Sequence, residues 1–218
     1  KRGISDCYIS LGSIYSAKGN SEKALETLTK ALNIKKEMND HKGISICMNL
    51  IGEEYLQNRE YDKACDFFNS AIRIKKEIDD KFGLVISYSN ISEAFLAKKE
   101  YQKARQKAGS ALNIADSINS LQDIPDLYLL IARTYTKQGR YKKATEYYEK
   151  YKPAYDSAYA KAGAEKINEL EIRYETEKKQ QQIELQQTQL AKQKAEISKS
   201  KTIQNALTGS IIAVLAIV

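Results

Sequence analysis

The chain has little of what turn-rich folds need. Its 218 residues include no Trp, only 2 Pro and only 10 Gly. Because Pro and Gly mark turns and bulges, this scarcity disfavours an all-β fold and favours long helices. Hydrophobic residues make up 42% and charged residues 29%, a balance that fits a packed fold and argues against wholesale disorder.

Residue types that serve catalysis and metal binding are also scarce. The single histidine, His41, lies in the linker "NDHKG", and Cys7, Cys47 and Cys65 form no Cys-x-x-Cys pair. A zinc site needs several such ligands together, so we interpret the cysteines as small apolar packing residues. The sequence has no Gly-rich phosphate loop. We therefore expect no metal, no cofactor and no enzymatic active site in this segment.

The net charge of +7 does not by itself indicate a nucleic-acid binder. The chain has 28 acidic residues beside its 35 basic ones. Their signs alternate along the sequence, as on solvated helix faces, and no basic cluster accompanies a nucleic-acid reading motif. We expect no nucleic-acid partner for this segment.

An internal repeat with a period of 40 residues runs through the chain to about residue 160. It places Gly3, Gly43, Gly83 and Asp123 in one column. The columns that follow are Tyr8, Met48, Tyr88, Tyr128; Leu11, Ile51, Ile91, Ile131; Gly12, Gly52, Ser92, Ala132; Tyr15, Tyr55, Phe95, Tyr135; Ala24, Ala64, Ala104, Ala144; Leu28, Phe68, Ala108, Tyr148; and Ala31, Ala71, Ala111, Tyr151.

The spacing of these columns predicts two antiparallel helices in each unit. Positions 8, 11, 12 and 15 recur at three and four residues and share one helical face, as do positions 24, 28 and 31. A short polar break such as "AKGNSE" separates the two helices. Small residues at positions 12 and 24 let the helix axes approach closely. One pair cannot bury its apolar stripe alone, so the units are expected to stack.

This order of aromatic, aliphatic, small and aromatic residues, followed by Ala, bulky, Ala, resembles the tetratricopeptide repeat. The resemblance implies an all-α solenoid of four helix-hairpin repeats, at about residues 3–42, 43–82, 83–122 and 123–160. Met48, Ala108 and Tyr151 depart from the pattern. The units are also longer than the usual repeat of about 34 residues, so the second helix of each pair is expected to extend further.

In this family the first helices of the pairs line a groove that takes a peptide or a protein partner. We expect Glu53 and Glu93 to make the middle of that groove acidic, with Arg133 and Lys137 basic beyond them. The alternative is that these side chains are simply solvated. Ile9, Ser13 and Ser16 share the same columns in the first unit. The candidate partner-binding residues are Asn49, Glu53, Gln57, Ser89, Glu93, Arg133 and Lys137.

After the repeats the pattern changes. Pro153 is expected to kink or end the last repeat helix. Residues 161–202 are rich in Ala, Glu, Lys, Gln and Leu, which predicts a long helical linker. Ile183, Leu190 and Ile197 are spaced as in a weak coiled-coil seam. We expect this helix to need a second copy, in a homodimer, or a neighbouring segment to stay ordered.

The chain ends in an apolar run. From Ala206 to Val218 only Thr208 and Ser210 are polar. We interpret residues 203–218 as the beginning of a truncated transmembrane helix, because a full span needs about 20 apolar residues. The alternative is a buried C-terminal core helix.

Repeats, a helix reading "ELEIRYETEKK", a lysine-rich flank and an apolar run also resemble bacterial membrane-anchored repeat sensors. The resemblance implies repeats outside the cytoplasm that bind a peptide or protein. The long helix would relay binding to a histidine kinase or DNA-binding module. Against this topology, Lys192, Lys194, Lys199 and Lys201 favour a cytoplasmic flank. The alternative function is a membrane-tethered scaffold that assembles complexes without an output of its own.

Overall fold

The computed structural model describes the backbone of residues 1–215 and the side chains of residues 1–160, 172, 175, 176, 178–194, 197, 198 and 201. This described part is all-α, as expected. The chain divides into two compact units, Lys1–Ala160 and Lys161–Val218. The helices are α1 (Arg2–Ala17), α2 (Ser21–Glu37), α3 (His41–Gln57), α4 (Tyr61–Glu77), α5 (Lys81–Ala97), α6 (Tyr101–Ser117), α7 (Asp123–Lys137) and α8 (Tyr141–Leu215).

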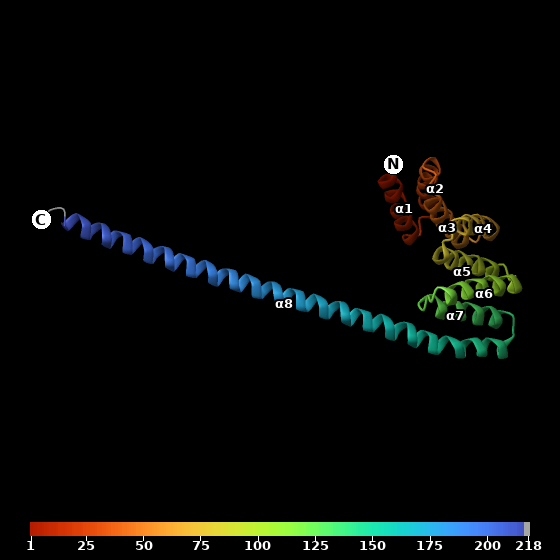
Figure 1. Cartoon of the computed structure of the whole chain (residues 1–218). Helices are drawn as coiled ribbons and strands as arrows, with labels where there is room; N and C mark the ends of the chain where they lie inside the picture. The colour runs from red at the N-terminus through yellow and green to blue at the C-terminus, as the bar shows by residue number, and fades with distance from the viewer. Residues whose placement is uncertain (216–218) are drawn as a thin grey trace. The chain divides into compact units, whose positions relative to one another are not determined.

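The helices of the repeat unit form a stack of antiparallel pairs (Figure 1). Each of α1 to α6 packs on the next helix in the chain. In addition, α1 touches α3, α3 touches α5 and α5 touches α7, whereas α2, α4 and α6 do not touch one another. The odd-numbered helices are therefore closer together than the even-numbered ones. They form the inner, concave wall of the solenoid, which confirms the predicted architecture.

Every helix from α1 to α7 ends in the same kind of turn. The residue after each C-cap has a positive φ: 72° at Gly19, 52° at Asn39, 64° at Arg59, 52° at Asp79, 62° at Lys99, 54° at Asn119 and 77° at Gly139. In the first of these turns Gly19 N donates to Ser16 O and Asn20 N donates to Tyr15 O, at 2.8 and 2.9 Å. This is the Schellman motif, which satisfies two carbonyls of the last helical turn.

Asparagine and aspartate side chains begin three of the helices. Asn20 accepts a hydrogen bond from Lys23 N at 3.2 Å, and Asp40 and Asp80 accept from Gly43 N and Gly83 N at 2.9 Å. Each bond satisfies a backbone N–H that has no partner inside its helix. Asp40 and Asp80 stand at the same place in the 40-residue period, so the same residue type starts α3 and α5.

The small-residue column sets the distance between the helices of a pair. A Cβ added to Gly12 would lie 2.7 Å from Leu28 Cγ, and one added to Gly52 would lie 2.6 Å from Phe68 Cε1. In the third unit Ser92 replaces glycine, and its partner position holds Ala108, which is fully buried. Ser92 Oγ donates to Ala104 O at 2.8 Å. The departure at Ala108 is thus matched by a larger residue on the facing helix.

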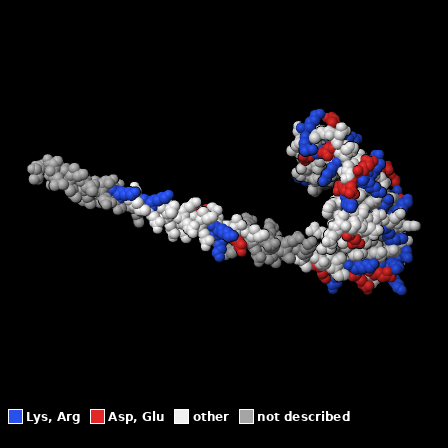
Figure 2. Space-filling model, in the orientation of Figure 1, with Lys and Arg blue, Asp and Glu red and all other residues white. Residues whose placement is uncertain are grey.

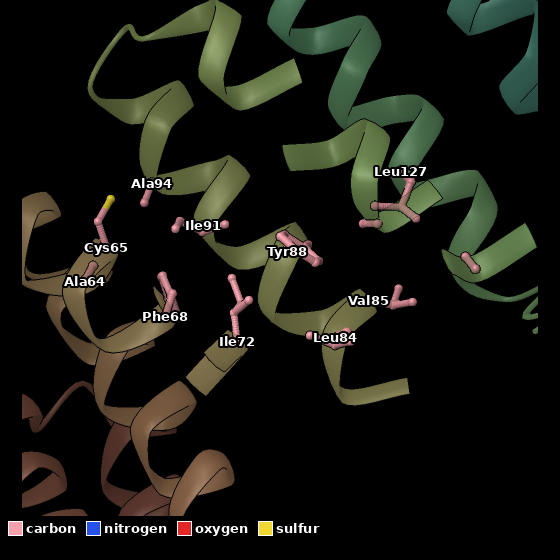
Figure 3. Packing of buried hydrophobic residues seen from close by; sticks show 12 residues of the cluster. Ala64, Cys65, Phe68, Ile72, Leu84, Val85, Tyr88, Ile91, Ala94 and Leu127 are labelled. Atoms are coloured by element: carbon pink, nitrogen blue, oxygen red, sulfur yellow. The ribbon is translucent and has the colours of Figure 1, made fainter. Parts of the chain in front are cut away.

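The hydrophobic core is continuous from one pair to the next. One cluster joins Phe68 and Ile72 of α4 to Val85 and Ile91 of α5, and it extends to Leu127 of α7 (Figure 3). Phe68 and Ile91 are fully buried. Because residues of one unit complete the core of the next, no unit buries its apolar stripe alone, as the sequence predicted.

The last helix differs in part from the prediction. Pro153 does not end the fourth repeat helix, because α8 includes it and runs from Tyr141 to Leu215. Every described side chain from residue 172 to residue 201 is exposed. No described helix has a stretch long and apolar enough to cross a membrane. The membrane segment expected at residues 203–218 lies outside the described side chains, and the coiled-coil pairing of residues 161–202 stays a prediction.

Candidate functional site

The candidate partner-binding residues all come from the odd-numbered helices of the concave wall. Asn49, Glu53 and Gln57 lie on α3, Ser89 and Glu93 on α5, and Arg133 and Lys137 on α7. Gln57, Arg133 and Lys137 are exposed, and Glu53, Ser89 and Glu93 are half-buried. Asn49 is different, because only 5% of it is exposed. It is placed to hold other side chains rather than to meet a partner directly.

Asn49 belongs to a polar network that joins α3, α4 and α5. Lys75 Nζ donates to Ser87 Oγ at 2.8 Å and to Gly83 O at 3.1 Å. Ser87 Oγ donates to Asn49 Oδ1 at 2.8 Å, and Asn49 Nδ2 donates to Glu53 Oε1 at 3.0 Å. Asn90 Nδ2 also donates to Glu53 Oε1, at 2.5 Å. The network fixes the carboxylate of Glu53 at the middle of the concave wall.

The network contains one carboxylate and one ammonium: Glu53 is half-buried and Lys75 is buried. Burial raises the pKa of the Glu53 carboxyl, and the hydrogen bond from Asn90 and the charge of Lys75 oppose that effect. Burial lowers the pKa of the Lys75 ammonium, and Asp80 and Glu53 oppose that effect. Desolvation disfavours the charged form in both cases.

The groove is not divided into an acidic middle and a basic region beyond it, contrary to the expectation from the sequence. Arg133 Nη1 pairs with Glu93 Oε1 at 2.8 Å, so one expected acidic residue and one expected basic residue neutralise each other. Glu53 accepts two amide hydrogen bonds instead of facing solvent freely. On the face seen in Figure 2, Lys and Arg are interspersed with Asp and Glu over the repeats.

Sequence reasoning missed three apolar residues on the concave wall. Phe82 and Ile86 of α5 are 62% and 50% exposed, and Ile46 of α3 is 37% exposed. Phe82 and Ile86 are four residues apart and lie on one face of α5, which also carries Asn90 four residues further on. The signal was present, because these residues fall outside the columns that form the core of each pair. Apolar residues in excess of the buried stripe often mark a contact surface.

A column of buried lysines was also missed. Lys35 on α2 and Lys75 on α4 are 40 residues apart, and only 4% and 3% of them is exposed. Lys35 Nζ contacts Asp6 Oδ1 at 2.7 Å and Asp40 Oδ2 at 3.0 Å. Its hydrogen bond to Asp6, together with Asp40, raises the pKa of Lys35. Lys75 has no ion-pair partner among the described residues.

At Gly43 and Gly83 the buried lysines, together with the carboxylates of Asp40 and Asp80 that begin the helices, leave no room for a side chain. A Cβ on Gly43 would lie 2.5 Å from Lys35 Cδ, and one on Gly83 would lie 2.9 Å from Lys75 Cε. The aliphatic stems of the lysines therefore occupy the space that a side chain would need. In the next unit the lysine position holds Ala115 and the glycine position holds Asp123. The loss of the lysine thus coincides with the loss of the glycine.

Two cavities open between neighbouring odd-numbered helices. One, of about 210 Å³, lies between α1 and α3, where Ser13, Ser16 and Glu53 line it. The other, of about 140 Å³, lies between α5 and α7. Its lining consists of Val85, Ile86, Ser89, Asn90, Asp123, Asp126 and Leu127. Both open beside residues predicted from the sequence to face a partner.

Comparison with protein families agrees with this architecture. The family model described as tetratricopeptide repeat matches residues 5–38, 47–78 and 125–151. The chain contains tetratricopeptide repeats. The matched segments leave out α5 and α6, the pair with the Ser92 and Ala108 exchange, although these helices pack together as the other pairs do. No curated protein sequence matches the chain.

Solved structures share the repeat fold. The apo form of RapI superposes with a TM-score of 0.67 at 20% identity, over 74% of this chain and 59% of that one. Aspartyl phosphate phosphatase F from Bacillus subtilis gives 0.68 at 20% identity, over 71% of this chain and 40% of that one. A Rap protein complexed with competence and sporulation factor gives 0.64 at 17% identity, over 69% of this chain and 42% of that one. At these identities the likeness concerns the fold, and the chain spans 59% or less of each protein's length.

Within the described side chains, no group of three or more His, Cys, Asp or Glu residues is placed to hold a metal ion. Burial raises the pKa of the Cys47 thiol to about 11 and raises that of Cys65 as well. A thiol with a raised pKa is a poor nucleophile and a poor metal ligand.

Proposed function

We propose that this chain binds a protein or peptide partner through the concave wall formed by α1, α3, α5 and α7. The observation that carries the proposal is the exposure of Phe82, Ile86 and Ile46 on that wall. An exposed apolar group next to fixed polar side chains suits a partner that buries apolar side chains and pairs its polar groups. The Glu53 network supplies such fixed polar side chains.

The test is a selection of phage-displayed peptides on the full chain, repeated with a groove variant carrying Phe82→Glu and Ile86→Glu. Tyr141→Glu is the matched control, because Tyr141 is 69% exposed at the start of α8. We expect peptides selected on the natural chain to bind the control equally and the groove variant at least about tenfold more weakly, as for loss of a central apolar anchor. Circular dichroism shows whether both variants stay helical. Equal binding to the groove variant would exclude this wall as the binding surface.

We further propose that the repeats are the sensory part of a membrane-anchored bacterial signalling protein. In this proposal they lie outside the cytoplasm and pass binding through the long helix to a kinase or DNA-binding module. The support is in the sequence: the helix-favouring residues 161–202, the apolar run from Ala206 to Val218 and the resemblance to repeat sensors. These features suit a helix that continues into a bilayer.

Cell fractionation tests the membrane part of this proposal. The full chain, expressed in bacteria, should sediment with membranes and resist extraction by salt, whereas a chain of residues 1–202 should not sediment. Alkaline phosphatase joined to Lys1 is active only outside the cytoplasm and reports the side on which the repeats lie. Recovery of the full chain in the soluble fraction would contradict the membrane anchor, and inactive phosphatase would contradict the topology.

A further inference from the structure

We propose that the cavity between α5 and α7 receives a lysine side chain from the partner. The proposal rests on the binding role of the concave wall and names the chemistry of one contact within it. The starting observation is that the two preceding junctions between units each hold a lysine of the chain itself. Lys35 fills the junction of α1, α2 and α3, and Lys75 fills that of α3, α4 and α5.

The third junction lacks this lysine. The residue 40 positions after Lys75 is Ala115, which is fully buried and cannot reach across the junction. The structure has a cavity of about 140 Å³ there instead. Its lining residues Asp123, Leu127 and Ser89 are the counterparts, 40 positions later, of Gly83, Ser87 and Asn49 in the Lys75 network. The cavity thus corresponds to the place of a lysine head group in the preceding unit.

The cavity has the chemistry that a lysine requires. Val85 and Leu127 are each only 2% exposed and form an apolar floor for an aliphatic stem; both are labelled in Figure 3. Asp123 and Asp126 bring two carboxylates to the rim. A long side chain with an apolar stem and a cationic tip matches such a combination, because the stem is buried while the charge meets carboxylates.

Among the described residues, the two carboxylates at the rim have few partners. Asp123 accepts a hydrogen bond from Ser120 Oγ at 2.5 Å. Asp126 is exposed and has no hydrogen bond or ion pair among the described residues. At the junction that holds Lys35, the carboxylate of Asp40 at the start of α3 contacts the lysine ammonium at 3.0 Å. The chain itself therefore shows an aspartate beside the start of the following helix pairing with a buried lysine.

The start of α7, beside the cavity, differs from that of the preceding units. Helices α3 and α5 begin at residues 41 and 81, so the period places the next start at residue 121, but α7 begins at Asp123. Leu121 and Gln122 form a turn instead of the first helical turn. Asp123, the first residue of α7, and Asp126 in the same turn both line the cavity.

The experiment titrates the full chain with N-acetyl-lysine methylamide and, separately, with its norleucine analogue, which has the same stem without the charge. Amide resonances of Ser89, Asn90 and Asp126 are followed by nuclear magnetic resonance. We expect saturable shifts with the lysine probe in the millimolar range and none with norleucine. Asp126→Asn should weaken binding by about fivefold, the loss of one solvent-accessible charge pair. Asp66→Asn, at an exposed site on α4, should leave it unchanged.

A second variant fills the cavity from inside. Ala115→Lys combined with Asp123→Gly restores the lysine and glycine pair of the preceding unit, and it should abolish the shifts while the chain stays helical. Equal shifts with both probes, no saturation, or equal affinity in Asp126→Asn would each overturn the proposal. If the chain bound groove peptides but did not respond to the lysine probe, only the proposed lysine contact would be refuted. Lysine binding without any groove-binding peptide would instead count against the wider function.

Discussion

The second and third units of the solenoid fold alike but pack with different residues. In the second unit Gly52 packs against Phe68, and Lys75 occupies the space beside Gly83 at the junction with the next unit. The third combines Ser92 with Ala108 and has Ala115 before Asp123. Within each helix pair, a larger residue at one facing position accompanies a smaller one at the other, whereas the junction of Ala115 and Asp123 has a cavity of about 140 Å³. The difference teaches that packing inside a helix pair is maintained by exchanging volume between facing positions, while a junction between units can leave space.

The strongest way to break this comparison is to change one member of the Gly52–Phe68 pair. We predict that Phe68→Ala lowers the free energy of unfolding by about 3–5 kcal/mol, because it leaves a cavity beside Gly52. Gly52→Ser alone should cost about 1–3 kcal/mol through overlap with the ring. The double variant reproduces the third unit and should cost less than the sum of the two. Urea unfolding followed by circular dichroism measures all three, and strict additivity would refute the volume exchange.

Replacing each of the two buried lysines by methionine should change the free energy of unfolding in opposite directions. Lys75→Met should raise the free energy of unfolding at neutral pH by about 1 kcal/mol, because it removes a buried ammonium without an ion pair. Lys35→Met should lower it by about 1 kcal/mol, a modest loss because Asp6 is half exposed and solvent screens the pair. Urea unfolding measures both changes. If both variants gained or both lost stability, burial of the lysine rather than its ion pair would determine the effect.

The pH dependence sharpens the same comparison. The folded-state pKa of Lys75 is lowered, so the unfolded chain binds more protons between that pKa and the ordinary lysine value of 10.5. Stability should therefore rise with pH across this window, and Lys75→Met should lose the rise. The pKa of Lys35 is raised, so its contribution is fully present below 10.5 and disappears only above that pH. A pH profile of unfolding that Lys75→Met leaves unchanged would contradict the buried charge.

The smallest expected effects concern the turns inside the hairpins. The first and fourth helix pairs have glycine at positive φ, at Gly19 and Gly139. The second and third pairs have Arg59 and Lys99 at this position. A side chain in this region is strained. Arg59→Gly or Lys99→Gly should therefore raise the free energy of unfolding by about 0.5–1 kcal/mol, after allowance for the flexibility of glycine in the unfolded chain. Gly139→Ala should lower it by a similar amount. Thermal unfolding measures these changes, and a loss at Arg59→Gly would mean that its side chain has a role beyond the turn.

Much of the fold could be predicted from the sequence because it depends on local and periodic features. The columns of Ala24 and Gly12 placed the two helices of a pair in contact, and the 40-residue period required the pairs to stack. Pro153 was expected to kink or end its helix, and the prediction of an end was wrong, since a helix can continue through proline when the surrounding turns remain favourable. The odd-numbered wall was also predicted, since it follows from the repeat family once the columns are aligned.

The candidate site could be predicted only in outline. Glu53, Glu93 and Arg133 were assigned to the groove, but their partners were not, because hydrogen bonds such as that between Asn90 and Glu53 join residues of different units. The exposure of Phe82 and Ile86 was missed for a related reason. A helix sequence shows which residues are apolar, but the neighbouring unit decides which of them it covers.

The sequence by itself determined the period, the helix pairs and the places where small residues must face large ones, because these follow from helical geometry and side-chain volume. Only the tertiary structure decided that Lys35 and Lys75 are buried and that Asn49 supports other residues. It also decided that a cavity lined by Asp126 opens between α5 and α7. A lysine or aspartate on a helix has the same local sequence whether it faces water or a neighbouring unit. Its surroundings are set by contacts between units 40 residues apart.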